Sequence, residues 1–403
     1  MKAAVSEYNT EAILLQLLAH ELFDTALSVN GGDVDWTGIL SLAEKHFVKP
    51  LLYRSAKQLS GVPDKVLDAL RASAISSALR NDSLMAIQAE ILCMFNKRSI
   101  SCAVLKGSSV SALYPYSEIR TLGDIDLLVD ASKLSDACSA LHENGYQHSS
   151  GHAFHECYEG KDAHIELHQA VSEFPDTDKG RYTAAYMKDA LRDTVIETLE
   201  NYRFPVLDIP YQITSLLSHM ERHLTDTGIS LRQLCDWAVT VNHYRDKMDE
   251  TALNILAQCG LHRFAETLTK TCTAYLGLPK LDWAEEIPDA MADAMMHEII
   301  TTGSTYEIGA VRGLSSAFIP DEHTDTKQTS LLGHYIFNVN RKARNEHPYF
   351  VKCPLLYPFF WLFYPVRWWI RSLRGTRQKI QAAKTLSIAY RRKKLYGELK
   401  LFR

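Results

Sequence analysis

Apolar residues recur at three- and four-residue spacing through the first quarter of the chain, which predicts helices over residues 11–30 and 38–59. A third helix is expected to begin at Pro63 and Asp64, a favourable helix start, and to run to about Lys97. The first quarter of the chain is therefore expected to be mostly helical.

The hydrophobic period then changes to that of strands. The run SCAVLKG and the run TLGDIDLLVDAS are both short and include β-branched residues. Alternation along the second run places Ile125 and Leu127 on the face opposite Asp124 and Asp126. The other elements expected in this part are helices at 109–116 and 133–144, a strand at 163–171, and its hairpin partner at 151–158.

Helical periodicity returns after about residue 205, and residues 303–333, rich in Gly, Ser and Thr, are expected to be loops. The helices expected here are 210–225, 229–246, 249–257, 261–275 and 284–301. We predict an α+β fold, a small mixed β-sheet core flanked by N- and C-terminal helical regions. The predicted divisions are an N-terminal helical region at 1–98, an α/β core at 99–204, a C-terminal helical domain at 205–345 and an aromatic, basic segment at 346–403.

The composition is that of an ordinary folded protein, with 46% hydrophobic and 23% charged residues. The eight cysteines lie far apart without a CxxC pair, which argues against a zinc ribbon or a disulfide scaffold and favours a reducing cytoplasm. The N-terminus is interpreted as an amphipathic helix and not as a signal peptide. Since no apolar run reaches the roughly 18 to 20 residues that a spanning helix needs, no transmembrane segment is expected.

The charge of the C-terminal segment differs from that of the rest. Residues 367–403 contain twelve Lys or Arg and one acid, a local net charge of +11, so residues 1–366 sum to −15. The preceding stretch, LLYPFFWLFYPVRWWIRSLRG, is dense in aromatic residues and interrupted by prolines. Two interpretations stay open for residues 354–403: peripheral contact with the inner membrane surface or a protein partner, and packing as a core layer of the C-terminal region.

The candidate chemistry lies in the α/β core. Asp124 and Asp126 are two residues apart on an expected strand, so both carboxylates face one side and suit Mg²⁺, with Mn²⁺ as an alternative. The preceding VLKGSSVSALY predicts a strand-to-helix turn, where Gly107 lets the backbone approach a triphosphate and Ser108 adds a hydroxyl donor. Glu166 in HIELH is a third carboxylate, and it is a candidate either to bind the metal or to take the proton from an acceptor hydroxyl. Together these residues predict phosphoryl transfer.

Each of these residues also has a simpler interpretation. The Asp pair is common at solvated strand ends, and Glu166 is an exposed strand residue if Asp162 is the acid that matters. Lys106 and Arg120 flank the turn and the Asp pair, which makes them candidate phosphate contacts, although surface cations beside acids need no ligand.

The histidines are weaker candidates. His219 and His223 are four residues apart, a spacing that suits a metal on one helix face, but a structural or substrate-facing role is favoured because no Cys or acid matches them. His164 and His168 flank Glu166 on the same strand face, which makes a contact with a phosphate or nucleotide one interpretation, but ordinary partly buried histidines are the favoured one. Asp236 in LCDWA is expected to cap or pair within the helical domain.

The order of a Gly-Ser turn, Asp-x-Asp and a separate strand carboxylate resembles the nucleotidyltransferase (polymerase β-like) superfamily. More closely, LKGSSVSALYPYSEIRTLGDIDLLVD followed by IELH is similar to a largely bacterial family of uncharacterised nucleotidyltransferases. That resemblance implies that Gly107 and Ser108 bind triphosphate and that Asp124, Asp126 and Glu166 bind the metal.

The resemblance implies an Mg²⁺-dependent enzyme that moves a nucleoside monophosphate from an NTP to an acceptor hydroxyl and releases pyrophosphate. The acceptor is a small molecule, a protein or an RNA, and a toxin-like enzyme acting on tRNA or protein is a weaker variant. The alternative is an inactive nucleotide-binding or interaction protein recruited through its C-terminal segment. This alternative stays open because the sequence departs from the superfamily pattern in two ways. Ser108 and Asp124 are sixteen positions apart, which is longer than is usual, and the third acid is Glu instead of the more frequent Asp.

Overall fold

The computed structural model describes residues 2–151, 154–172, 174, 177–302, 315–320, 330–346, 358–364, 366–367 and 382–401. The strands are β1 (Cys102–Leu105), β2 (Ile125–Val129), β3 (Gln147–Gly151), β4 (His155–Gly160), β5 (Ala163–His168), β6 (Thr194–Leu199) and β7 (Tyr202–Leu207). The helices are α1 (Lys2–Phe23), α2 (Trp36–Lys45), α3 (Leu52–Gln58), α4 (Asp64–Lys97), α5 (Gly107–Ser111), α6 (Leu134–Glu143), α7 (Asp178–Met187), α8 (Ile209–Thr225), α9 (Leu231–His243), α10 (Glu250–Gln258), α11 (His262–Leu276), α12 (Asp289–Thr302), α14 (Leu331–Glu346) and α16 (Ala382–Glu398).

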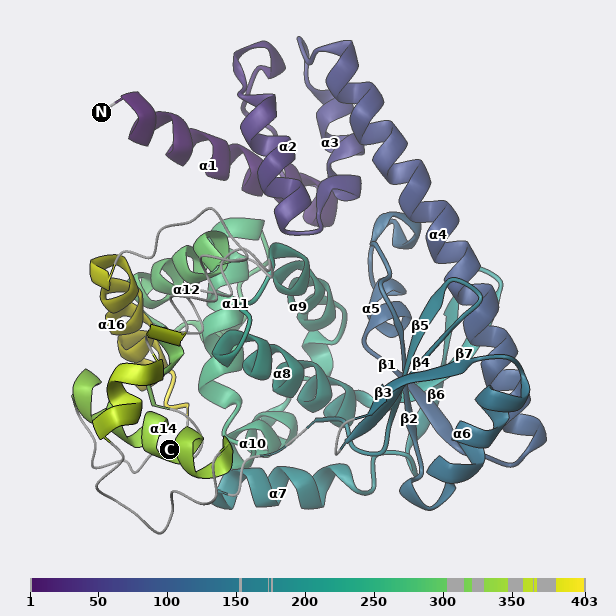
Figure 1. Cartoon of the computed structure of the whole chain (residues 1–403). Helices are drawn as coiled ribbons and strands as arrows, with labels where there is room; N and C mark the ends of the chain where they lie inside the picture. The colour runs from purple at the N-terminus through teal and green to yellow at the C-terminus, as the bar shows by residue number, and fades with distance from the viewer. Residues whose placement is uncertain are drawn as a thin grey trace.

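The strands form one mixed sheet in the order β3-β4-β5-β2-β1-β7-β6, at the right of Figure 1. The pairs β2–β5 and β1–β7 are parallel, while β1–β2, β3–β4, β4–β5 and β6–β7 are antiparallel. This arrangement confirms the α+β prediction with a mixed sheet between helical regions. It also makes β2 and β5 neighbours in the middle of the sheet.

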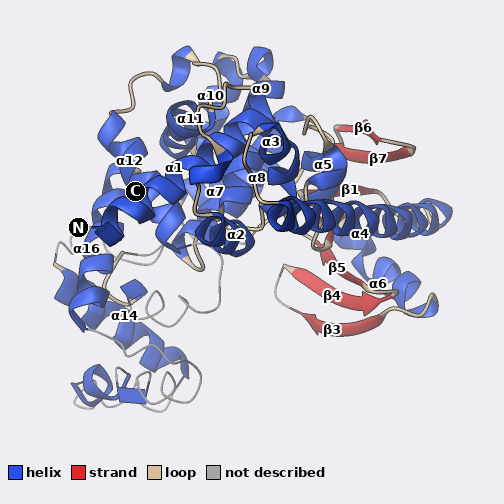
Figure 2. Ribbon diagram, turned by 90° about the horizontal axis from the view of Figure 1, so that it is seen from above, coloured by secondary structure: helices blue, strands red, loops and turns tan. Residues whose placement is uncertain are grey.

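The two faces of the sheet differ in chemistry. Phe95 of α4 packs with Ile125 and Leu127 in one apolar core, to which α6 also contributes. Figure 2 shows the long helix α4 running across the strands. Because side chains alternate along a strand, Asp126 and Glu166 face the other side, as the sequence predicted.

The N-terminal and C-terminal helices share one apolar core. Leu14 of α1, Ile39 of α2, Trp237 of α9 and Phe264 of α11 are fully buried within it. In Figure 1, α1 to α3 lie above the group formed by α8 to α12. The helical regions on either side of the sheet in sequence are therefore packed together in space, and the domain boundaries given above stay predictions.

Several elements differ from those predicted. Helix α1 includes the N-terminal helix expected from the sequence but ends at Phe23 instead of residue 30. The single helix expected over 38–59 is divided into α2 and α3, with Pro50 in the short 3-10 turn between them. Strand β3 was not predicted because all of its residues are exposed and show no apolar alternation. Helix α7 and the hairpin β6–β7 were also not predicted. In the hairpin, Pro205 lies within β7 although proline disfavours a strand, and the exposed positions of β6 obscure the alternation.

The C-terminal segment lies largely outside the described residues, as does most of the 303–333 stretch predicted as loops. Within the described part, Phe360 is buried against Tyr335 and Val339 of α14, as the core-layer interpretation expects. Phe359 and Leu362 are exposed. Among the described residues, no helix combines the length and the apolar character that crossing a bilayer requires.

His46 links three parts of the helical core. Its fully buried ring accepts a hydrogen bond from the Leu231 backbone N–H at 3.2 Å, and its Nε2 lies 3.3 Å from the Ile300 carbonyl oxygen. These partners suit a neutral ring in which Nε2 carries the proton and donates to the Ile300 carbonyl oxygen, while Nδ1 accepts from the Leu231 N–H. A second proton, on Nδ1, would point at the Leu231 N–H and remove that hydrogen bond. Burial, and then the charge of Lys45, lower the pKa of His46 to about 4.

We expect acid to destabilise the fold through His46. The unfolded ring titrates near 6.5 and the folded ring near 4, so neutral His46 contributes fully above pH 6.5 and its contribution is lost as the pH falls toward 4. The loss amounts to about 3 kcal/mol. Urea unfolding of wild type and His46→Gln, measured from pH 7.5 to 4, tests this expectation. The free energy of unfolding of wild type should exceed that of His46→Gln at pH 7.5, and this difference should become smaller as the pH falls. Parallel pH profiles would contradict this assignment.

Candidate active site

The strand-to-helix turn predicted at Gly107 is present between β1 and α5. Lys106 and Gly107 both have positive φ, 41° and 43°, which turns the chain sharply at the end of the strand. This backbone is readily adopted by glycine but strained for a lysine, as is common at functional sites. A Cβ at Gly107 would lie 3.7 Å from the Asp124 carbonyl oxygen, so the turn lies beside the segment that enters β2.

Ser108 follows the turn but faces α4. Its hydroxyl donates to Oε1 of Gln88 at 2.7 Å, and both side chains are buried. The hydroxyl is thus held by the helix that covers the opposite face of the sheet, and triphosphate binding by Ser108 stays a prediction.

Asp126 and Glu166 are directly opposite each other on the parallel strands β2 and β5. The Asp126 carboxylate is 2% exposed and the Glu166 carboxylate 21% exposed. Lys106 Nζ lies 2.8 Å from Asp126 Oδ1, so the turn after β1 places the positive charge of Lys106 beside the two carboxylates. Asp124 immediately precedes β2 and is partly buried.

His168 joins the two carboxylates. Its Nε2 lies 2.9 Å from Asp126 Oδ1 and 3.1 Å from Glu166 Oε2, with the ring almost fully buried. His164, at the other side of Glu166, pairs with Glu159 at 2.6 Å and lies 3.6 Å from Glu166 Oε1. His168 is therefore more deeply buried than predicted, and both of its partners are candidate site carboxylates. Its alternation with Glu166 on one strand face was the available signal.

The pKa values of the carboxylates follow from these contacts. Burial opposes ionisation of Asp126, but Lys106 and His168 outweigh it and hold the pKa of Asp126 well below its usual range. The hydrogen bond from His168 lowers the pKa of Glu166. Repulsion from Asp126, together with burial, raises the pKa of Asp124. Negative charge is therefore concentrated here beyond what Lys106 and His168 neutralise.

The donor set fits a divalent cation. Asp126, Glu166 and His168 each offer one ligand atom, and these atoms lie within 4.8 Å of one another. The two carboxylates suit Mg²⁺ or Mn²⁺, while Nε2 of His168, which contacts both of them, orients them. A bound cation would also relieve the repulsion that raises the pKa of Asp124.

Helix α8 places two histidines beside Lys106. His219 Nδ1 lies 3.5 Å from Lys106 Nζ, and the rings of His219 and His223 are edge-to-face at 4.4 Å. Burial, and then the Lys106 charge, lower the pKa of His223 to about 4 and hold the pKa of His219 well below its usual range, so both rings are neutral at pH 7. Within the described part of the chain, no group of three potential ligands includes either ring.

Arg232, at the start of α9, adds a second cation that the sequence motifs did not indicate. Its Nη1 donates to the Thr121 carbonyl oxygen at 3.3 Å, close to the segment that carries Asp124. Its buried Nε has no hydrogen-bond partner among the described residues. Arg232 belongs to a helical region where strand-based motifs give no signal.

Arg120 is engaged elsewhere. Its guanidinium donates to both carboxylate oxygens of Asp236, from Nε at 3.1 Å and from Nη2 at 2.7 Å, and Asp236 also accepts from the Tyr114 hydroxyl at 2.7 Å. The expectation that Asp236 pairs within the helical domain was wrong, because both partners belong to the α/β core. Asn81 of α4 donates to the Arg120 carbonyl oxygen at 2.8 Å. Arg120 thus links the sheet region to α9 through a buried ion pair.

The structure brings Lys106, Asp126 and Glu166 together, with Asp124 beside them, whereas Ser108 and Arg120 face other partners. A protein family described as uncharacterised nucleotidyltransferase matches residues 32–277, which is more than half of the chain. The matched range contains α4, the whole sheet and the helices α8 to α11. No curated protein matches the chain.

Proposed function

The chain belongs to this nucleotidyltransferase family, and we propose that it transfers a nucleoside monophosphate from an NTP to an acceptor hydroxyl, releasing pyrophosphate, with Mg²⁺ or Mn²⁺ as the required ion. The observation that carries this proposal is the register of Asp126 opposite Glu166, with Lys106 Nζ 2.8 Å from Asp126. Two adjacent carboxylates beside a cation are the arrangement that in-line phosphoryl transfer needs.

Asp124, Asp126 and Glu166 are the residues that would hold the metal. When bound, the ion neutralises phosphate charge and favours both bond formation and departure of pyrophosphate. His168 holds Asp126 and Glu166 in place, since one ring nitrogen contacts both of them. The orientation of the carboxylates is therefore set before a nucleotide arrives.

The remaining residues act on the nucleotide and the acceptor. The acceptor oxygen forms a bond to the α-phosphorus while the bond from that phosphorus to the bridging oxygen breaks, and pyrophosphate leaves with the electron pair. The hydroxyl proton passes to Glu166, which is more exposed than Asp126 and is thus reachable by an acceptor. Lys106 and Arg232 would contact the triphosphate as fixed cations.

The test is metal-dependent nucleotide binding and turnover by the full chain. Calorimetric titration of ATP and GTP is expected to show binding that strengthens with Mg²⁺, and incubation with labelled NTP is expected to release pyrophosphate. Binding that ignores Mg²⁺, with no pyrophosphate formed, would contradict the proposal and favour the inactive nucleotide-binding alternative.

Arg232→Ala is expected to weaken NTP binding about 10- to 150-fold, because a hydrogen bond to a charged group contributes about 1.5–3 kcal/mol. Arg232→Lys should recover part of the affinity, since it keeps the charge but not the planar donors. Arg222→Ala, an exposed arginine on α8, is the control. An unchanged dissociation constant in Arg232→Ala, measured by the same titration, would remove Arg232 from the nucleotide site.

A further inference from the structure

A second group of potential metal ligands adjoins the site, on the strand next to β5. Strand β4 pairs antiparallel with β5, so that Cys157 is opposite Glu166 and His155 is opposite His168. Residues at alternate positions of a strand share a face. His155 and Cys157 therefore lie on the same face of the sheet as Glu166.

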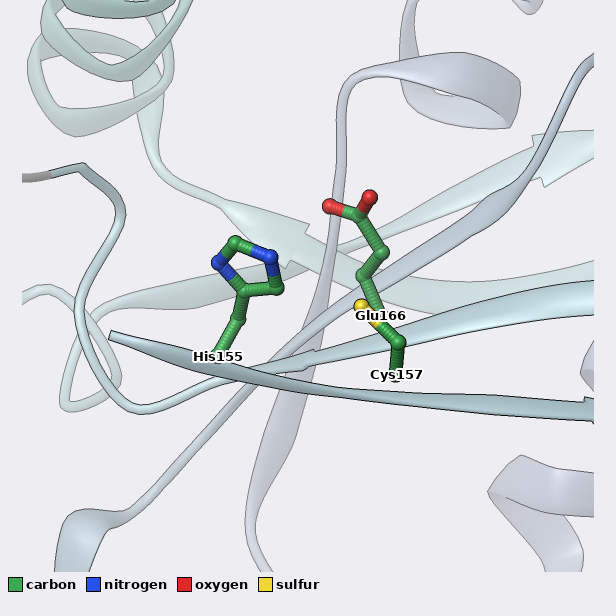
Figure 3. Close-up of side chains that lie close together, drawn as sticks. All are labelled: His155, Cys157 and Glu166. Atoms are coloured by element: carbon green, nitrogen blue, oxygen red, sulfur yellow. The ribbon is translucent and has the colours of Figure 1, made fainter. Parts of the chain in front are cut away.

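The three side chains converge. His155, Cys157 and Glu166 each offer one ligand atom, and these atoms all lie within 4.8 Å of one another. Figure 3 shows the imidazole, the thiol and the carboxylate rising from the same side of the two strands. The thiol is shielded from solvent, since Cys157 is 4% exposed, while His155 and Glu166 are partly exposed and leave a route for an ion.

The chemistry of this group differs from that of the neighbouring one. Asp126, Glu166 and His168 offer mainly hard oxygen donors, whereas His155 and Cys157 offer nitrogen and sulfur. Thiolate and imidazole select zinc-class ions over Mg²⁺. Three protein ligands also leave a fourth position of a tetrahedral ion free for water or a substrate atom.

We propose that His155, Cys157 and Glu166 bind a zinc-class divalent cation next to the Mg²⁺ site. Glu166 belongs to both groups of ligands, so its carboxylate connects the two positions. The cation would fix this carboxylate from the side of β4, while His168 contacts it from β5. This inference goes beyond the proposed function, because the cation can be measured without any nucleotide.

The spacing of these ligands explains why the cysteine pattern gave no signal. Zinc motifs are recognised by CxxC or similar spacing in turns. Here the ligands occur as His-x-Cys and as Glu on two paired strands, where the register, and not the sequence separation, brings them together.

Titration with Co²⁺, a spectroscopic substitute for Zn²⁺, tests the proposal on the full chain. Wild type is expected to show a cobalt–thiolate charge-transfer band in the near ultraviolet that is saturated by one Co²⁺ per chain, whether or not further Co²⁺ binds at the carboxylate site, and Zn²⁺ should abolish the band. Cys157→Ser should lose the band, and His155→Ala should weaken Co²⁺ binding at least about 10-fold. Cys93→Ser, which removes an exposed cysteine, should behave as wild type.

Absence of the band in wild type, or its persistence in Cys157→Ser, overturns the proposal. If the serine variant does not fold, as judged by circular dichroism, Cys157→Ala provides the same readout. Asp124→Asn separates the two hypotheses, because Asp124 lies outside this ligand group: the band should remain even where nucleotidyl transfer is lost. A chain that binds Co²⁺ through Cys157 but never releases pyrophosphate would contradict the proposed function alone.

Discussion

Replacing Asp124 and Asp126 together by asparagine is expected to lower nucleotidyl transfer at least about 10³-fold, since charge stabilisation by a bound metal contributes several kcal/mol to such a reaction. The two carboxylates provide most of the negative charge next to Lys106, and asparagine keeps their shape while removing that charge. Incorporation of labelled nucleotide measures the loss.

Folding must be controlled in this experiment, because Asp126 is the partner of Lys106 and His168. Asp124→Asn alone is the better test, as it leaves both ion pairs of Asp126 in place. Asp136→Asn, an exposed acid on α6, is the matched control and should retain full activity. A folded Asp124→Asn/Asp126→Asn protein with undiminished transfer would refute the assignment of the site.

Replacing Asp236 by alanine is expected to destabilise the fold by about 3–5 kcal/mol, the usual cost of leaving a buried charge without its partner. Both Arg120 and Asp236 have side chains that are 5% exposed, so water cannot replace the missing carboxylate. The Tyr114 hydroxyl loses its acceptor as well. Thermal and urea unfolding of the purified variant measure this loss of stability.

A double variant separates charge from packing. Arg120→Met/Asp236→Leu should recover much of the lost stability, since a buried ion pair can be replaced by apolar side chains of similar size. Asp189→Ala, which breaks the exposed pair with Arg192, should cost less than about 1 kcal/mol. Equal losses in Asp236→Ala and Asp189→Ala would show that the buried pair contributes no special stability.

The Arg120–Asp236 ion pair also affects the candidate active site. Asn81 donates to the carbonyl oxygens of Glu118 and Arg120 and accepts from the Leu122 backbone N–H, so α4 and α9 hold the segment that leads to Asp124 from two sides. Arg120 therefore positions a candidate metal ligand through the backbone. The sequence indicated Arg120 as a candidate phosphate contact, whereas in the structure its partner is Asp236, 116 residues away in sequence.

The sequence by itself determined the local features of this protein. Alternation along TLGDIDLLVD placed Asp124 and Asp126 opposite Ile125 and Leu127, and the glycine of the LKG turn matched its positive φ, because both properties depend on neighbouring residues only. The long helix from Asp64 to Lys97 was predicted for the same reason.

Only the tertiary structure decided which chemical groups meet. Register between β2 and β5 set Asp126 opposite Glu166, and register between β4 and β5 set Cys157 opposite Glu166. The packing of α8 brought His219 to Lys106 in the turn after β1, and the packing of α9 brought Arg232 to Thr121, in the segment before β2. Strand pairing and helix packing arise from the shape and burial of whole surfaces, so the spacing of residues along one chain does not specify them.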